Sequence, residues 1–142
     1  MYKVMIFHSD NSVSDALLRI FQKQRNNFKI VKKEAHVPDA LDFLKSDLPD
    51  MIFFEIGNSI EQSFAIADYI ERMELPIMTI AVSNKAEFSY VVEAIQHHVN
   101  DFMTVPIAAK AVQNTISRFQ KKKIQCGKWI NVNEEMHCKG VC

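Results

Sequence analysis

The sequence contains little glycine, cysteine and tryptophan for its length. It has 142 residues but only three glycines, three cysteines and one tryptophan. Gly57 is the only glycine before residue 127, so the chain lacks the glycine-rich loop that cradles phosphates in nucleotide-binding proteins. All three cysteines lie at residue 126 or beyond, so no disulfide framework organises the body of the chain.

Long apolar runs and an excess of one charge are also missing. No apolar run approaches the roughly 20 residues that a membrane-spanning helix needs, and residues 1–10, MYKVMIFHSD, lack a signal-peptide pattern. Lys and Arg together number 17, as do Asp and Glu, so the formal net charge is zero. No global field then attracts nucleic acid or a membrane surface. We expect a cytoplasmic chain that is not an enzyme and does not bind DNA directly.

The sequence does contain a regular alternation of two kinds of apolar segment. Five short runs, four of them almost continuously apolar, are typical of buried strands. They are Lys3–Phe7, Phe28–Val31, Met51–Phe54, Ile77–Val82 and Phe102–Thr104. The polar continuation of the second run, KKE, indicates an edge strand. With helical spacing between the runs, the pattern predicts an α/β fold, a doubly wound five-stranded parallel sheet of the (βα)5 type.

The predicted helices have identifiable starts and apolar stripes. Ser12 is predicted to cap the first helix, with Asp15 in the capping-box position, and Pro38 suits the first turn of the second. The fifth helix is expected to start near Ile107 and to end at about Lys123. The stripes are Leu17, Leu18 and Phe21; Ala40, Leu41 and Leu44; Ile60, Phe64, Ala67 and Ile70; Phe88, Val91, Val92 and Ile95; Val112, Ile116 and Phe119.

The character of the sequence changes after residue 123. We predict one domain over residues 1–123 and a C-terminal tail or linker stub over residues 124–142. The tail holds thiols and an imidazole, which together suit tetrahedral zinc. The candidate ligands are Cys126, His137, Cys138 and Cys142. Because no CxxC pair is present, we expect free thiols and no metal, and a zinc or redox module remains an alternative.

Polar residues follow several predicted strands at the ends where parallel sheets carry their binding sites. These ends are His8-Ser9-Asp10, Glu55-Ile56-Gly57, Ser83-Asn84 and Val105-Pro106. In the third strand a charge, Glu55, directly follows an apolar run. A charge placed there indicates the mouth of a site.

Residues 1–123 resemble the receiver domain of two-component response regulators, and most of all the kind that precedes an AraC-type DNA-binding domain. The segments MYKVMIF, PDMIFFEI, EFSYVVEAI and DFMTVPI carry this resemblance at the family's spacing. The resemblance implies a flavodoxin-like fold and a role in phosphorelay signalling or transcription regulation. It also implies a histidine kinase as a possible partner and an output domain that this chain does not contain.

The first and third strand ends depart from the family's pattern. Receivers hold Mg²⁺ with two acidic residues after the first strand, and here those positions are His8 and Ser9, followed by Asp10. The phospho-accepting Asp of the family is replaced by Glu55, whose extra methylene moves the carboxylate by more than ~1 Å. Because Mg²⁺ prefers carboxylate oxygens, the resemblance implies weak or absent Mg²⁺ binding and no other cofactor.

Of the last two strand ends, one keeps the family's residue and the other does not. Ser83 matches the family's Ser or Thr that binds phosphoryl oxygens, whereas Val105 replaces a near-universal Lys. The position of the aromatic switch residue is taken by Phe102, and the preceding Gly is replaced by His98. Phosphoryl transfer depends on positioning and charge neutralisation, so we expect no phosphorylation by the usual route.

Three other interpretations of this pocket stay open. Glu55 could imitate a phosphorylated Asp, or it could be a working acceptor together with Asp10 and Ser83. His8 could titrate as a pH sensor beside the carboxylates.

The remaining functional prediction concerns a surface. In receivers the fourth helix, fifth strand and fifth helix form the usual output and dimer face, and here it would present Glu93, His97, Asp101, Lys110, Asn114 and Arg118. Mixed charges on this face could pair across a two-fold axis. The resemblance and its departures predict a pseudo-receiver, a phosphorylation-independent module for binding a protein partner or for homodimerisation.

Overall fold

A computed structural model of the chain describes residues 2–8, 11–23, 27–57, 60–83 and 88–126. Strands and helices alternate along it. The strands are β1 (Tyr2–Phe7), β2 (Phe28–Glu34), β3 (Met51–Glu55), β4 (Met78–Ser83) and β5 (Asp101–Thr104), and the helices are α1 (Asn11–Lys23), α2 (Val37–Ser46), α3 (Ile60–Arg72), α4 (Phe88–Gln96) and α5 (Ala109–Cys126). Within these ranges no helix is long and apolar enough to cross a membrane.

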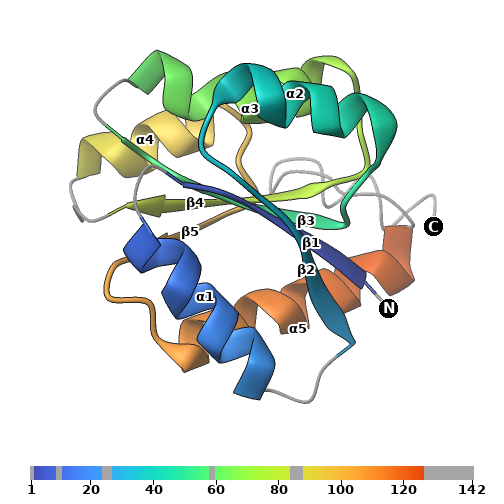
Figure 1. Ribbon diagram of the computed structural model, residues 1–142, viewed down its shortest axis with the longest axis vertical. Helices are drawn as coiled ribbons and strands as arrows, with labels where there is room; N and C mark the ends of the chain where they lie inside the picture. The colour runs from blue at the N-terminus through green and yellow to red at the C-terminus, as the bar shows by residue number, and fades with distance from the viewer. Residues whose placement is uncertain (1, 9–10, 24–26, 58–59, 84–87, 127–142) are drawn as a thin grey trace.

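The strands form one parallel sheet in the order β2-β1-β3-β4-β5. Figure 1 shows α2, α3 and α4 covering one face of this sheet and α1 and α5 covering the other. The predicted doubly wound (βα)5 architecture is therefore confirmed. β2 is an edge strand, as its polar continuation indicates, and its register shifts between Val4 and Met5 of β1.

Each face of the sheet has its own buried core. Side chains of successive strand residues point to opposite faces, so a strand covered on both sides must be apolar at every position. Met51 and Phe53 pack with α1 and α5, whereas Ile52 and Phe54 pack with α2 and α3. All four are fully buried, which explains the unbroken apolar run of β3.

Two helical details differ from the sequence prediction. α1 begins at Asn11, so Ser12 lies inside its first turn and is not the N-cap. Ile95 is 64% exposed, and its neighbour Ala94 is buried instead. The inward stripe of α4 runs through Tyr90 and Ala94, out of phase with the predicted stripe. Pro38 does lie in the first turn of α2, as predicted.

α3 and α4 both end with a residue in the left-handed conformation that favours glycine. Glu74 has a φ of 52° and His98 a φ of 60°. The chain then turns back, with the N–H of Leu75 donating to the carbonyl of Ile70 at 3.0 Å and the N–H of Val99 donating to that of Ala94 at 3.0 Å. These are Schellman-type helix ends built without glycine.

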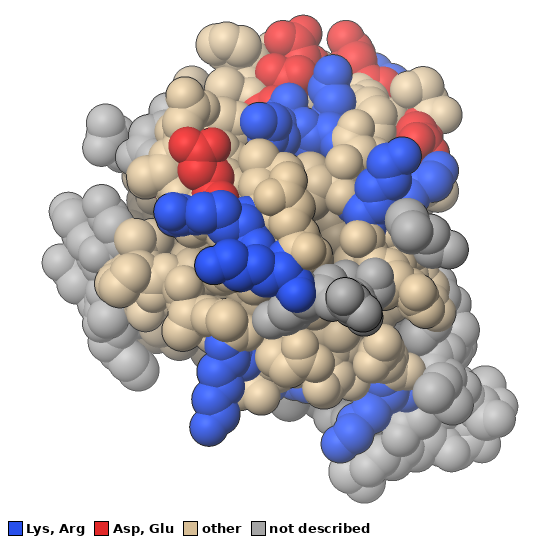
Figure 2. Space-filling view, turned by 60° about the horizontal axis from the view of Figure 1, so that its bottom comes forward, with Lys and Arg blue, Asp and Glu red and all other residues tan. Residues whose placement is uncertain are grey.

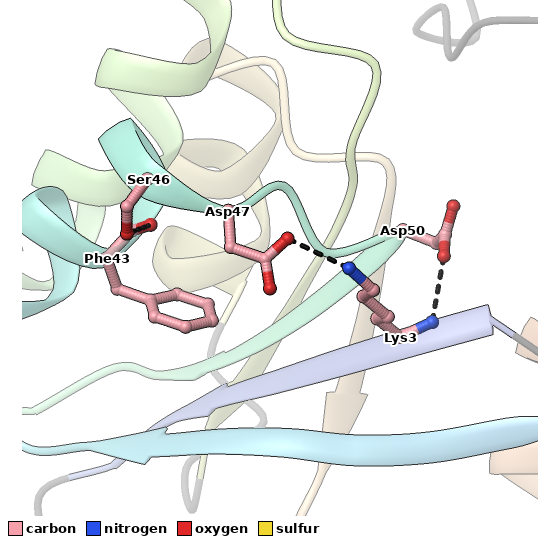
Figure 3. A network of polar contacts seen from close by, with 5 residues as sticks. All are labelled: Lys3, Phe43, Ser46, Asp47 and Asp50. Carbon is pink, nitrogen blue, oxygen red and sulfur yellow. Dashed lines mark hydrogen bonds and ion pairs between the residues drawn. The ribbon is translucent and has the colours of Figure 1, made fainter.

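Side-chain hydrogen bonds join the strands at the amino-terminal edge of the sheet. Asp50 Oδ2 accepts from the backbone N–H of Lys3 at 2.8 Å, and Lys3 Nζ donates to Asp47 Oδ1 at 2.9 Å (Figure 3). Asn100 Oδ1 accepts from the backbone N–H of Thr79 at 2.8 Å and from Thr79 Oγ1 at 3.1 Å. These contacts tie together the starts of β1, β3, β4 and β5.

Candidate functional site

The strand-end residues predicted from the sequence lie at one edge of the sheet. β1 and β3 pair as far as Phe7 and Phe54, so His8 and Glu55 are the next residues on neighbouring strands. β4 ends at Ser83, whose backbone carbonyl accepts from the N–H of Val105 at 2.9 Å. The four residues thus follow one another across β1, β3, β4 and β5. Ser9 and Asp10 lie outside the described residues.

His8 is half-buried at the end of β1. Its backbone N–H donates to the carbonyl of Glu34 at 3.0 Å. Its side-chain Nδ1 is buried, and no described residue gives it a hydrogen bond. Imidazole is a borderline-soft ligand, whereas Mg²⁺ needs hard oxygen ligands in an octahedral set.

Glu55 and Ser83 supply the polar oxygens of this edge. Glu55 is half-buried at the end of β3, and Ser83 is only 1% exposed. In the loop after β3, the N–H of Gly57 donates to Ser63 Oγ at 2.8 Å, which fastens the loop to α3. Among the described residues, no group of three His, Cys, Asp or Glu side chains could hold a metal ion. The described donor set therefore does not fit Mg²⁺.

Val105 is the last of the four strand-end residues and directly follows β5. It is half-buried and packs against the core between the sheet and helices α1 and α5. The peptide bond that joins it to Pro106 is cis. An apolar side chain at this point brings no positive charge to an anionic group on Glu55.

The comparisons with known proteins agree with this geometry. No family model matches the chain. The sensory transduction protein LytT of Bacillus subtilis (strain 168) is 23% identical over 121 residues, which are 85% of this chain and 49% of LytT. The transcriptional regulatory protein BtsR of Salmonella typhi is 23% identical over 123 residues, 87% of this chain and 50% of BtsR. The chain spans about half the length of these curated relatives.

Solved structures match the whole fold. A response regulator from Thermotoga maritima superimposes with a TM-score of 0.74 at 13% identity, covering 85% of this chain and 98% of that one. The signal receiver domain of the putative response regulator NarL from Mycobacterium tuberculosis superimposes with a TM-score of 0.73 at 17% identity, covering 84% and 96%. The chain has the receiver-domain fold of response regulators. The resemblance to receivers that precede an AraC-type domain stays a prediction.

Phe102, which the sequence predicts for the aromatic switch position, points into the fold. It is half-buried and packs against the core on the α2, α3 and α4 side. Its backbone N–H donates to Asp101 Oδ1 at 2.9 Å.

Two residues predicted for the output face of the receiver lie in a cluster between α3 and α4. His97 Nδ1 is 2.6 Å from Asp68 Oδ1, and His97 Nε2 is 3.4 Å from Glu93 Oε2. The imidazole also stacks on Phe64, with ring centroids 4.5 Å apart and planes 11° from parallel. Both nitrogens face carboxylates and can donate together only in the protonated ring. This cluster joins α4 to α3.

A second pair of predicted face residues is also engaged within the chain. Asp101 Oδ2, at the start of β5, accepts from Arg118 and from Thr115 Oγ1 on α5. The Asp101 side chain is 15% exposed and that of Arg118 is 50% exposed. Lys110 and Asn114 lie exposed on α5. The mixed charges of this face thus pair inside one receiver to a large extent.

Sequence reasoning missed two residues of this region, Asp68 and Thr115, and gave a third, Ile95, the wrong environment. Asp68 could have been found from its helical spacing, since it lies one turn from the stripe residue Phe64. Thr115 lies three residues before Arg118 on the same helical face. Ile95 was placed in the core, whereas the structure exposes it on α4.

The tail candidates for zinc are not brought together. Cys126 is the last residue of α5, and His137, Cys138 and Cys142 lie outside the described residues. The zinc or redox alternative therefore stays a prediction.

Proposed function

We propose that this receiver is a pseudo-receiver, a non-enzymatic module that binds a protein partner or a second copy without being phosphorylated. The observation that carries the proposal is Val105 at the end of β5, packed into the core where a reactive receiver needs a cation. A phosphoryl group on Glu55 would carry about two negative charges. Its transfer requires that this charge be neutralised, and an isopropyl group cannot do so.

The metal side of the pocket supports the same proposal. Of the family's two carboxylates after β1, the first is replaced by His8, whose Nδ1 is buried, and the second by Ser9. A neutral imidazole and a hydroxyl attract Mg²⁺ far less than two carboxylates. Glu55 supplies a carboxylate at the acceptor position. It can therefore imitate a phosphorylated Asp and hold the receiver in an active-like state without phosphorylation.

The surface through which this receiver would act lies on α4, β5 and α5. The α4 helix is joined to α3 by the cluster of Asp68, His97 and Glu93, which holds α4 in place without any phosphoryl group. Ile95 adds an apolar side chain, 64% exposed, that a partner can bury. Burying it fully would stabilise an interface by roughly 1–2 kcal/mol.

A light-scattering series tests the surface. We expect association that grows with protein concentration and is the same with and without Mg²⁺ and a small-molecule phosphodonor. Ile95→Asp should weaken it at least tenfold, whereas Met73→Asp, at the exposed end of α3, should not. A monomer at all concentrations would exclude self-association and leave a different protein, such as a histidine kinase or the regulator's own output domain, as the partner. Association that appears only with the phosphodonor would contradict the proposal.

A further inference from the structure

The charges of this receiver are separated between its two helical layers, although its net charge is zero. The described charged residues of α1 and α5 are nearly all cations: Arg19, Lys23, Lys110, Arg118 and Lys121, against one carboxylate, Asp15. The helices on the other face carry mainly carboxylates: Asp39, Asp42, Glu61, Asp68, Glu71 and Glu93, against Lys45 and Arg72. The net charge of zero is therefore the sum of a positively charged helical layer and a negatively charged one.

The cations lie on one continuous surface. α1 and α5 lie on the same face of the sheet, where Leu17, Phe21, Ile116 and Phe119 belong to one buried core. Figure 2 turns this side toward the viewer: Lys and Arg side chains lie across its middle and lower part, and its upper part carries Lys and Arg together with Asp and Glu. We call the exposed residues of α1 and α5 the α1/α5 surface.

The cations on this surface lie at several points along both helices. Arg19 and Lys23 are four residues apart, about one helical turn, so their Cβ atoms lie about 5–6 Å apart on one side of α1. Lys110 and Lys121 bracket three turns of α5, about 16 Å. Between described residues, no ion pair involves these four cations.

The uncharged part of the surface indicates which kind of anion it fits. Protein interfaces need apolar residues at their centre and are depleted of lysine. The large apolar side chains exposed in the described part of the chain are Leu48, Met73 and Ile95, and none of them is on α1 or α5. The neutral residues between the cations are hydrogen-bond donors instead: Gln22, Gln113, Asn114, Ser117 and Gln120, all exposed. Amides, hydroxyls, lysine and arginine are the groups that contact the phosphates of DNA.

We propose that the α1/α5 surface binds the phosphate backbone of duplex DNA without reading its sequence. Net charge alone predicts no DNA binding, but the field that a nucleic acid meets is that of the nearest surface. This contact is independent of the pocket chemistry and of Ile95 on α4, and it shares α5 with the surface proposed above.

Fluorescence anisotropy of the full chain with a labelled 20-base-pair duplex tests this proposal. In about 50 mM salt we expect binding in the micromolar range, and a plot of log K against log salt with a slope of about −3 to −4, since about four phosphates are contacted. The variant Arg19→Glu/Lys23→Glu should weaken binding at least tenfold and reduce the slope by about two. Circular dichroism of the variant checks that it is folded.

The matched control changes the same net charge on the other layer. Lys45→Glu/Arg72→Glu should leave DNA affinity within about twofold of the unchanged protein. Polyglutamate at equal charge concentration should bind at least tenfold more weakly than DNA. An equal loss in both double variants, equally tight binding of polyglutamate, or no binding at about 0.1 mM protein would overturn the proposal.

Discussion

The two edges of the central sheet have different chemistry. At the amino-terminal edge, side chains of Asp47, Asp50 and Asn100 bond directly to neighbouring strands. At the carboxyl-terminal edge, where receivers carry out phosphoryl chemistry, β5 is followed directly by Val105, whose side chain packs against the core. If the proposed pseudo-receiver is correct, the comparison teaches that a fold can keep the contacts that set its strand register while the residues for its family's reaction are replaced. The side-chain contacts that stabilise the sheet lie at one end of the strands, and the positions of the family's reactive residues lie at the other end.

The largest expected effect comes from rebuilding the reactive edge. The variant His8→Asp/Ser9→Asp/Glu55→Asp/Val105→Lys supplies the family's two metal-binding carboxylates, its acceptor and its cation on an unchanged sheet. With Mg²⁺ and a small-molecule phosphodonor, we expect its phosphorylation rate to exceed that of the unchanged protein by more than about 10²-fold. Intact-mass spectrometry measures the adduct.

The same rebuilt variant with Glu55→Ala in place of Glu55→Asp is the control, since it has no acceptor. If the rebuilt protein is folded but stays unlabelled, the altered pocket residues are not what silences this receiver, and the contrast between the edges fails.

The next effect concerns stability at the amino-terminal edge. Asn100→Ala leaves the backbone N–H of the buried Thr79 without its acceptor, and we expect a loss of about 1–3 kcal/mol in the free energy of unfolding. Val105→Ala, at the opposite edge, removes methyl groups of a partly buried side chain and should cost about 1 kcal/mol or less. Urea unfolding compares the two. Equal losses would show that the edges do not differ in their contribution to stability.

A smaller effect of opposite sign is expected where α3 turns back toward the amino-terminal edge. Glu74 has a Cβ in a left-handed conformation, so Glu74→Gly should raise the free energy of unfolding by about 0.5–1 kcal/mol. Glu71→Gly, inside α3, is the control and should lower it by a similar amount. Thermal unfolding followed by circular dichroism separates these two directions.

The smallest effect is a pH dependence at the same edge. The hydrogen bond from Lys3 lowers the pKa of Asp47, so the ionised carboxylate stabilises the folded state. That contribution is present above the ordinary aspartate pKa and is lost as the pH falls through the lowered value. Lys3→Met should therefore reduce stability slightly at neutral pH and not at about pH 2. A difference that persists at low pH would assign the effect to packing rather than to the ion pair.

Much of the fold could be predicted from the sequence because it follows from period and burial. The unbroken apolar run Met51–Phe54 requires a strand covered on both faces, and the polar end of β2 requires an edge. The phase of α4 could not be predicted, because Ala94 and Ile95 are both apolar and only packing decides which one turns inward. The predicted start of α1 was wrong for a similar reason, since several polar residues before Val13 could precede a helix.

The site could be predicted only as a set of positions. Parallel strands bring their carboxyl ends together, which is why His8, Glu55 and Ser83 could be grouped without coordinates. Contacts between helices, such as the one between Asp68 and His97, depend on how α3 packs beside α4; helical spacing places Asp68 one turn from Phe64 but does not identify His97 as its partner. The separation of charge between layers was missed because the sum over the chain is zero.

The claim that this receiver works without phosphorylation is tested most directly by the intact mass of the unchanged protein after incubation with Mg²⁺ and a small-molecule phosphodonor. The account predicts a single unmodified mass, equal to that of a sample without Mg²⁺. An added phosphoryl group that requires Mg²⁺ and is lost in Glu55→Gln would contradict it, because Glu55 would then be a working acceptor.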